Sequence, residues 1–115
     1  MVNKDLIRGT LKPILLSVLG EGKRLYGYEI SKMVSEKTSD QIQLTDGALY
    51  PMLHKLEKEG LVQVDKVEVG SRIRKYYTLT VKGQEESEKK VDELLTFIRS
   101  MVLLLRPQNL SYDAY

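Results

Sequence analysis

The residues best suited to bind a partner lie on one face of a stretch predicted to be a helix, Thr45–Val62. At about 100° per residue, one face is apolar and carries Leu49, Leu53, Leu56 and Gly60, with Met52 at its edge. The opposite face carries Gly47, Tyr50, Pro51, His54 and Lys58, with Lys55 alongside. A buried stripe backed by donors, rings and lysines is typical of a helix that reads a nucleic-acid groove. An amphipathic helix with a merely solvated outer face is the alternative, and this stretch taken alone favours that simpler interpretation.

A basic hairpin is predicted directly after this helix. Two β-rich runs, residues 61–67 and 72–79, flank a four-residue turn that contains Gly70, which is the pattern of an antiparallel hairpin. Its return strand carries Arg72, Arg74 and Lys75, whereas Tyr77 and Leu79 are expected to be core residues. Basic hairpins can be solvated edges that discourage strand pairing. After a candidate groove-reading helix, however, the hairpin is expected to lie along phosphates or in the minor groove.

Composition excludes several other classes of protein. A chain of 115 residues is expected to form one domain with a modest core, and 42% hydrophobic residues argue against wholesale disorder. There is no cysteine, hence no disulfide or thiolate metal site, and the single histidine, His54, argues against a histidine-rich metal site. No paired carboxylates in an apolar setting, nucleophile beside a base or glycine-rich phosphate loop occurs, so neither an enzyme nor a cofactor is expected.

The longest strongly apolar run, residues 101–105, is too short to span a bilayer. The first residues lack a signal-peptide core, so a cytoplasmic protein without a membrane partner is expected. The net charge of +2 is weak evidence for nucleic acid, but its distribution is informative. Residues 1–32 carry six basic and three acidic side chains, whereas residues 80–106 carry five of each. The positive excess therefore lies away from the C-terminal helix.

Two further helices are predicted before the groove-reading helix. The first covers residues 3–19, with Asn3 as its cap, and we expect a single helix kinked at Pro13; the alternative is a second helix that starts at Thr10. Residues 20–24 are expected to form a turn. The second helix covers residues 26–35, and Gly27 in its first turn allows close approach of either a phosphate or the first helix, with neither favoured. Residues 41–44 alternate like one short strand.

The last predicted helix, residues 81–106, starts at the cap residue Thr80 and stops before Pro107. Its first half is polar. Its second half has heptad spacing over two repeats, at Val91, Leu94, Ile98, Met101 and Leu105, and Leu95, Phe97 and Val102 widen the apolar seam. A long helix that leaves a small domain cannot bury its far half there, so self-association is expected over folding back. Residues 107–115 are expected to be a flexible tail.

The order helix, helix, short strand, helix, two-stranded wing and long helix is that of a winged helix-turn-helix. The chain resembles the PadR family of bacterial transcriptional regulators in three motifs. These are Tyr26–Ile30; Gly47–Pro51 with Leu53, Leu56, Glu57, Gly60 and Leu61; and Arg72, Arg74, Lys75, Tyr76, Tyr77, Leu79, Thr80 and Gly83. The motifs occur in order over residues 6–83, which is most of the chain. The single C-terminal helix is similar to the compact branch of the family.

The resemblance implies a mainly α protein with a small β-hairpin, in which residues 1–79 bind DNA and residues 80–106 dimerise. It implies a homodimer on a palindromic operator of double-stranded DNA, and repression lifted by a small-molecule effector. The implied DNA-binding residues are Tyr26, Thr45, Gly47, Tyr50, His54, Lys55, Arg72, Arg74 and Lys75. In the implied dimer interface, the last helices pair with each other and with the partner's first helix. Its residues are Leu6, Leu11, Val91, Leu94, Leu95, Ile98, Met101, Val102 and Leu105.

An effector site is expected where the first and last helices of both subunits meet, with Leu6, Ile7, Leu11, Leu94, Phe97, Ile98 and Met101 as candidate liners. Phe97 is the only ring in the last helix and the chain has no tryptophan, so a closed dimer core is slightly preferred over a site for flat aromatic ligands. Two other functions stay open: a winged helix that binds protein, and one that binds RNA. The basic wing, the polar helix face and the dimer seam favour DNA.

Overall fold

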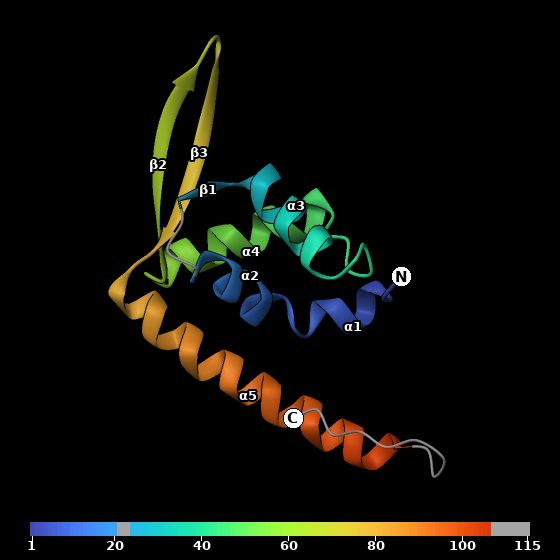
Figure 1. Ribbon diagram of the computed structural model, residues 1–115. Coiled ribbons are helices and arrows are strands. Elements are labelled where there is room, and N and C mark those ends of the chain that lie inside the picture. The colour runs from blue at the N-terminus through green and yellow to red at the C-terminus, as the bar shows by residue number, and fades with distance from the viewer. Residues whose placement is uncertain (21–23, 107–115) are drawn as a thin grey trace.

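The computed structural model describes residues 1–20 and 24–106. It contains five helices and three strands in this part of the chain (Figure 1). In order they are α1 (Lys4–Arg8), α2 (Leu11–Leu19), β1 (Leu25–Tyr26), α3 (Gly27–Lys37), α4 (Asp46–Lys58), β2 (Val62–Val69), β3 (Arg72–Leu79) and α5 (Val81–Leu105). This confirms the predicted fold class, mainly helical with a β-hairpin and a long C-terminal helix. The predicted tail, residues 107–115, and most of the turn predicted at residues 20–24 lie outside the described residues.

The prediction of one kinked helix over residues 3–19 is wrong, because the chain forms two helices that meet at Gly9 and Thr10. Thr10 is the N-cap residue of α2, and its hydroxyl donates to the carbonyl oxygens of Leu6 and Ile7. Pro13 is thereby the third residue of α2, where the helix needs no backbone N–H donor. In one continuous helix, Pro13 would have left the carbonyl of Gly9 without its donor.

The strand predicted over residues 41–44 is also wrong, since no ladder forms there. The alternation is nevertheless expressed as burial, because Ile42 and Leu44 pack against the core while Gln41 and Gln43 are exposed. The third strand is instead β1, which pairs antiparallel with β3 so that the order in the sheet is β1-β3-β2. Two residues are too few for a periodic sequence signal, and the pairing depends on where β3 lies.

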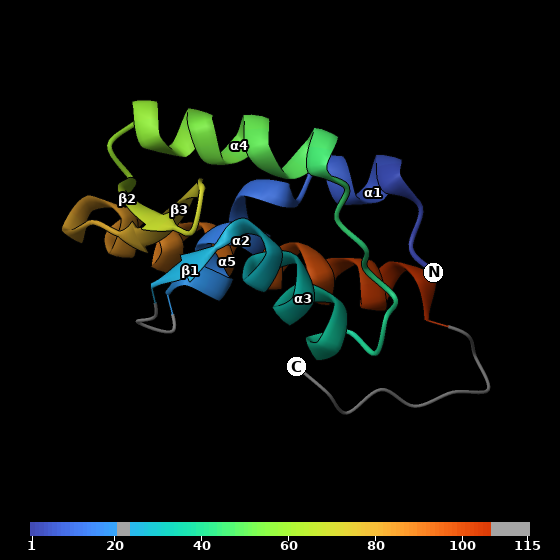
Figure 2. The same cartoon turned by 90° about the horizontal axis from the view of Figure 1, so that it is seen from above.

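The other predicted elements are confirmed with small shifts of their ends. Asn3, Thr45 and Thr80 each accept a backbone N–H at a helix start, as their types predict. Gly60 ends the α4 region with a φ of +75°, a conformation that favours glycine, and Gly70 at the hairpin turn has a φ of +62°. The hairpin β2–β3 projects away from the helices (Figure 1), and α4 lies along one edge of the domain (Figure 2).

The core is formed by α2, α3, α4 and the base of the sheet. Its fully buried side chains are Leu15, Leu16, Leu19, Ile30, Leu49, Leu53 and Leu56. The predicted core position of Tyr77 is confirmed, since 5% of it is exposed, and Leu79 packs against the same cluster. Burial raises the pKa of the Tyr77 hydroxyl. The three leucines on the inner face of α4 therefore fix this helix and leave its other side free.

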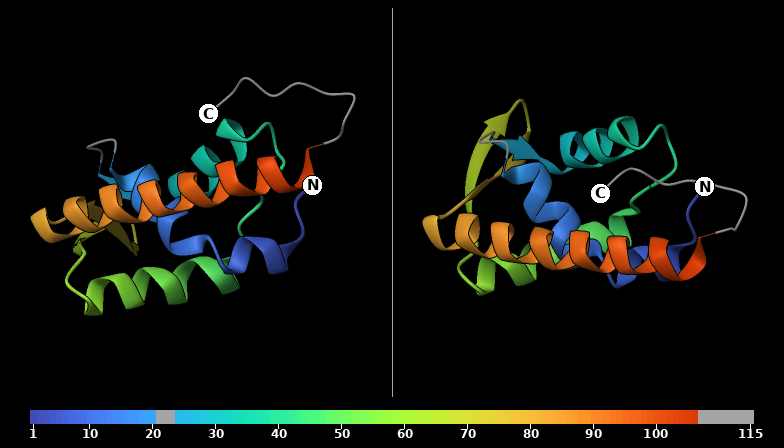
Figure 3. Two further views of the ribbon diagram at one scale, coloured as in Figure 1. Left: turned by 90° about the horizontal axis from the view of Figure 1, so that it is seen from below. Right: turned by 60° about the horizontal axis from the view of Figure 1, so that its bottom comes forward.

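The long helix α5 runs along the underside of the domain (Figure 3). Gly83 allows it to start close to the chain before the wing, because a Cβ there would overlap the carbonyl oxygen of Leu61. Ser87, one turn later, is buried next to Gly20 at the end of α2. The second half of α5 extends past α2 (Figure 3), and its apolar side chains are half-buried or exposed.

Candidate nucleic-acid interface

The N-terminal half of α4 presents exposed polar groups at a well-defined helix start. The hydroxyl oxygen of Thr45 accepts the N–H of Ala48 at 3.2 Å, and Asp46 lies in the first turn. Gly47 is exposed, and a Cβ there would touch only the Thr45 hydroxyl, 4.0 Å away. The helix continues through Pro51, which is also exposed. A phosphate or base edge can therefore approach this end of the helix closely.

The four α4 residues predicted to read DNA are exposed, but α4 divides them between two concave surfaces. Tyr50 and His54 lie on the side of the hairpin, in a concavity of about 470 Å³ shared with Arg74, Lys75 and Glu57. Gly47 and Lys55 lie on the other side, facing α1. Pro51 borders the α1 side as well. The sequence placed these residues on one polar face, whereas the structure shows a ridge with two flanks.

Tyr50 is held by the backbone of α3. A Cβ on Gly27 would lie 2.7 Å from Cζ of Tyr50, so only glycine leaves room for the ring there. The close neighbour of Gly27 is therefore a side chain of α4, and not the first helix as the packing alternative proposed. Tyr50 remains 44% exposed. The contact thus orients a ring that still faces solvent.

The hairpin places its basic side chains differently from one another. Arg72, next to the turn, and Lys75 are exposed. Arg74 is half-buried, and its guanidinium donates to the hydroxyl of Tyr76 at 3.5 Å, which raises the Arg74 pKa. The guanidinium carbon of Arg74 also lies 4.1 Å from the centroid of the Tyr26 ring. Arg74 is thus bound within the protein, while Arg72 and Lys75 are open to a partner.

Arg24, Tyr28 and Tyr76 extend this contact into a stack of two arginines and three tyrosine rings that sequence reasoning missed. Arg24 lies over the Tyr76 ring at 4.4 Å, and the rings of Tyr76 and Tyr26 meet edge to face at 5.5 Å. Tyr28 stacks on Tyr26, with 6.3 Å between the ring centroids. The backbone N–H of Tyr26, the N-cap residue of α3, donates to the Glu29 carboxylate. The stack joins the base of the hairpin to the start of α3, and its only sequence signal was the clustering of tyrosines and arginines at two distant places.

A further basic residue of the hairpin, Lys66, was also missed. The register of β2 and β3 places Lys66 directly opposite Lys75, and both are exposed. Like charges directly opposite one another destabilise a sheet, unless an anion binds between them. The four-residue turn predicted from the sequence would have placed Lys66 opposite Ile73. The observed turn has only two residues, because Val69 pairs with Arg72, and this shift brings the two lysines together.

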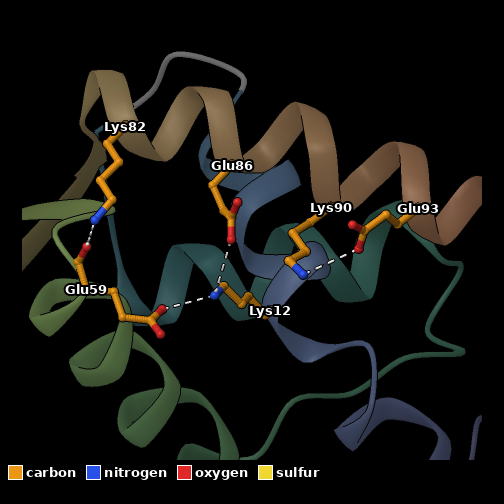
Figure 4. A network of polar contacts seen from close by, with 6 residues as sticks. All are labelled: Lys12, Glu59, Lys82, Glu86, Lys90 and Glu93. Atoms are coloured by element: carbon orange, nitrogen blue, oxygen red, sulfur yellow. Dashed lines mark hydrogen bonds and ion pairs between the residues drawn. The ribbon is translucent and has the colours of Figure 1, made fainter.

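An ion-pair network joins the C-terminal end of α4 to α2 and α5 (Figure 4). Lys12 binds Glu59 at 3.0 Å and Glu86 at 3.6 Å, while Lys82 donates to the backbone carbonyl of Glu59. The hydrogen bond from Lys12 is the main cause that lowers the pKa of Glu59. This network connects the helix that presents the polar ridge with the helix that leaves the domain.

The apolar seam of α5 continues a stripe that is buried at its other end. Gly83 and Ser87 are buried, and the same spacing of three and four residues leads on to half-buried or exposed side chains. These are Val91, Leu94, Ile98, Met101 and Leu105, flanked by Leu95 and Val102. Leu6 is 70% exposed, whereas Leu11 is buried in the protomer's own core. Among the candidate liners of the effector site, Ile7 and Leu11 line one concavity and Phe97, Ile98 and Met101 line another, so the described protomer does not bring these two groups together.

Two features are absent from residues 1–20 and 24–106. No group of three or more potential metal-ligating side chains lies together in this part of the chain. No helix of the described residues is both long and apolar enough to cross a membrane.

Comparisons with known proteins agree with this geometry. The family model described as transcriptional regulator PadR-like family matches residues 15–89. An uncharacterized protein of Lysinibacillus sphaericus is 37% identical over 81% of this chain and 85% of its own length. A solved transcriptional regulator from Clostridium thermocellum is 33% identical, with a TM-score of 0.76, over 88% of this chain and 95% of that one. A PadR family regulator from Eggerthella lenta is 29% identical, with a TM-score of 0.75, over 90% and 88%.

Proposed function

The chain belongs to the PadR-like family of transcriptional regulators, and from this premise we propose that it acts as a homodimer that represses transcription from a palindromic operator. Members of this family are DNA-binding regulators, not enzymes. The finer claims, which are the dimer, the two-fold operator, repression and an effector, are the proposal. A regulator of chromosomal genes would carry out this function in the bacterial cytoplasm.

One arrangement carries the proposal: the exposed polar ridge of α4 lies beside a basic hairpin, and the same protomer carries the partly exposed apolar seam of α5. A helix N-terminus and a basic strand can contact one half-site together. Pairing of two α5 seams would relate two such half-sites by a two-fold axis. Half-sites about 10 bp apart, or a multiple of this, then follow from the pitch of DNA.

Each DNA-binding residue has a proposed role. Tyr50, His54 and Lys55 would contact base edges in the major groove, and Gly47 would let the backbone approach. Thr45 would cap α4 and contact a phosphate. Phosphates would also be bound by Arg72, Lys75 and Tyr26. Arg74 would hold the hairpin through Tyr26 and Tyr76, in place of the direct phosphate contact expected from sequence.

The dimer interface would be formed by the α5 seam (Val91, Leu94, Leu95, Ile98, Met101, Val102 and Leu105), with Leu6 of the partner's α1. Leu6 and the seam residues expose apolar surface that a second copy would bury. Leu11 would contribute from beneath, since 5% of it is exposed. In the dimer cleft, Phe97 would contact an effector together with Ile98 and Met101, which line the same concavity, whereas Ile7 lines a different one.

Footprinting on the protein's own promoter region tests the proposal. We expect protection of two half-sites related by a two-fold axis, and an affinity whose salt slope is about −0.9 for each phosphate contacted. A monomer in sedimentation, or equal affinity for operator and random duplex, would contradict it. Competition with structured RNA tests the RNA-binding alternative. If the regulatory activity is retained after Arg72, Lys66 and Lys75 are replaced by alanine, the winged helix binds protein.

A further inference from the structure

We propose that the concavity between α1 and the first half of α4 binds a small aliphatic carboxylate, and that the bound molecule lowers the affinity for DNA. This α1–α4 pocket has a volume of about 470 Å³. Small-molecule sites have volumes of about 300–1,000 Å³. The pocket is lined neither by Leu6 nor by the α5 seam, and of the proposed interface residues only the buried Leu11 borders it. The ligand site and its effect therefore go beyond the function proposed above.

The floor of the α1–α4 pocket is aliphatic. Ile7 and Leu11 of α1 and α2 contribute one wall, and Ala48 and Met52 of α4 contribute the other. These side chains are buried or packed against the core, so the floor is preformed. None of the described residues that line the pocket is aromatic. A flexible alkyl chain fits such a floor better than a flat ring, which gains most from an aromatic partner.

The rim of the α1–α4 pocket is cationic. Lys4 and Arg8 come from α1 and Lys55 from α4, and no acidic residue is present among the described residues that line the pocket. Arg8 pairs with Asp5 at 3.2 Å, but both side chains are 74% exposed, and such pairs are weak in water. Arg8 can therefore turn to an anion at the rim. An aliphatic floor under three cations is complementary to an alkyl chain that ends in a carboxylate.

Two other occupants fit this pocket less well. A DNA phosphate could reach the cations, but it would leave the aliphatic floor without a partner. The partner's α5 is expected against Leu6, which is 70% exposed, whereas Ile7, the next residue of α1, is buried toward the pocket. Successive helix residues are about 100° apart, so the dimer contact and the pocket use different faces of α1.

The pocket is coupled to DNA binding through α4. Gly47 and Lys55, two of the proposed DNA-reading residues, belong to its wall. A carboxylate at the rim would bind Lys55 and place negative charge beside the helix start that approaches the phosphates. The ligand and the operator would then compete for the same cation. This effect on DNA rests on the proposed function, whereas binding of the ligand does not.

Octanoate is the probe, and 1-octanol is its uncharged counterpart. Without DNA, we expect octanoate to bind in calorimetry with one site per protomer, and to give nuclear Overhauser contacts to the Ala48 and Met52 methyl groups. 1-Octanol should bind at least about tenfold more weakly, because it cannot pair with the cations. Absence of saturable octanoate binding, or contacts to Phe97 and not to these methyl groups, would overturn the proposal.

Two matched variants locate the charge contribution. Lys4→Glu/Arg8→Glu should weaken octanoate binding by about tenfold or more, since two cations of the rim become anions. Lys32→Glu/Lys89→Glu changes the net charge equally at exposed positions away from the pocket and should leave octanoate binding unchanged. Both pairs lie on the surface, so circular dichroism can verify that each variant is folded. Equal loss in both variants would overturn the site.

The effect on DNA is measured separately, by operator affinity with and without octanoate. We expect octanoate to lower the affinity of the parent protein and to have no effect on Lys4→Glu/Arg8→Glu. If the protein binds no operator, the proposed function fails while the calorimetric result stands. If octanoate binds but leaves operator affinity unchanged, the coupling fails. If it does not bind while Lys4 and Arg8 variants lose operator affinity, the rim is a phosphate contact and the ligand proposal is wrong.

Discussion

Arg74 lies over the ring of Tyr26, with 4.1 Å between the guanidinium carbon and the ring centroid. These residues are far apart in the sequence and meet because β1 pairs with β3. A cation held over a ring and hydrogen-bonded to Tyr76 is already partnered, whereas the exposed Arg72 is free to bind phosphate. The two arginines lie two positions apart on β3, yet they have different expected roles.

Replacing these two arginines should separate the roles. Arg72→Ala should reduce the salt slope of operator binding by about 0.9 for each phosphate that the arginine neutralises. Arg74→Ala should weaken operator binding because it loosens the hairpin. It should leave the salt slope nearly unchanged, because no contact to a phosphate is lost. Fluorescence anisotropy across a salt series measures both quantities. A slope for Arg74→Ala that falls as much as that of Arg72→Ala would show that Arg74 binds a phosphate directly.

Gly27→Ala should act through Tyr50. The added methyl group would displace the Tyr50 ring, so operator affinity should fall. The ring is half exposed and can turn to solvent, so the free energy of unfolding should change by less than about 1 kcal/mol. In a Tyr50→Ala background, Gly27→Ala should cost no further affinity. Equal losses in the two backgrounds would mean that Gly27 contacts DNA itself.

Lys66→Ala should have opposite effects on stability and on binding. Removing one lysine of the Lys66–Lys75 pair relieves a repulsion and should stabilise the free protein by about 0.2–1 kcal/mol. The same change should lower operator affinity and the salt slope, because the pair presents charge to one phosphate. Urea unfolding and anisotropy measure the two effects. Lys66→Gln, which keeps a long polar side chain, is the control for the packing of the lysine stem.

The stability of the protein should depend on Glu59 in acid. Because its folded-state pKa is lowered, its contribution is complete above the ordinary value near 4.5 and is lost as pH falls through the lowered value. The loss should be less than about 1 kcal/mol, since Glu59 is 37% exposed and the pair is screened. In Glu59→Gln and in Lys12→Met, the free energy of unfolding, measured with urea, should depend less on pH over this acid range. An unchanged acid profile in both variants would contradict the assignment.

A charge on the α5 seam should dissociate the proposed dimer. Ile98→Asp would place a carboxylate within the proposed interface, so sedimentation should show a monomer and operator binding should become much weaker. Leu103→Asp is the matched control, because Leu103 is 73% exposed and lies about 140° around the helix from Ile98. A dimer that survives Ile98→Asp but not Leu103→Asp would place the interface on the other face of α5.

Much of this protein could be predicted from local patterns. The caps Asn3, Thr45 and Thr80 and the turn glycines Gly60 and Gly70 act through their nearest neighbours, so they mark element ends in any context. The period of Leu49, Leu53 and Leu56 identified the buried side of α4, since the helical repeat alone decides which side chains share a face. The family motifs then predicted the fold class and the DNA-binding function.

Only the tertiary structure decided what lies next to each of those surfaces. Gly27 was identified as a point of close approach, but its neighbour, Tyr50, comes from another helix. Arg74 and Arg72 differ because β1, too short to predict, brings Tyr26 under one of them. Periodicity reports which side of an element is buried, and contacts between residues distant in sequence depend on how all elements pack together. The two flanks of α4, one facing the hairpin and one facing the α1–α4 pocket, are such a result.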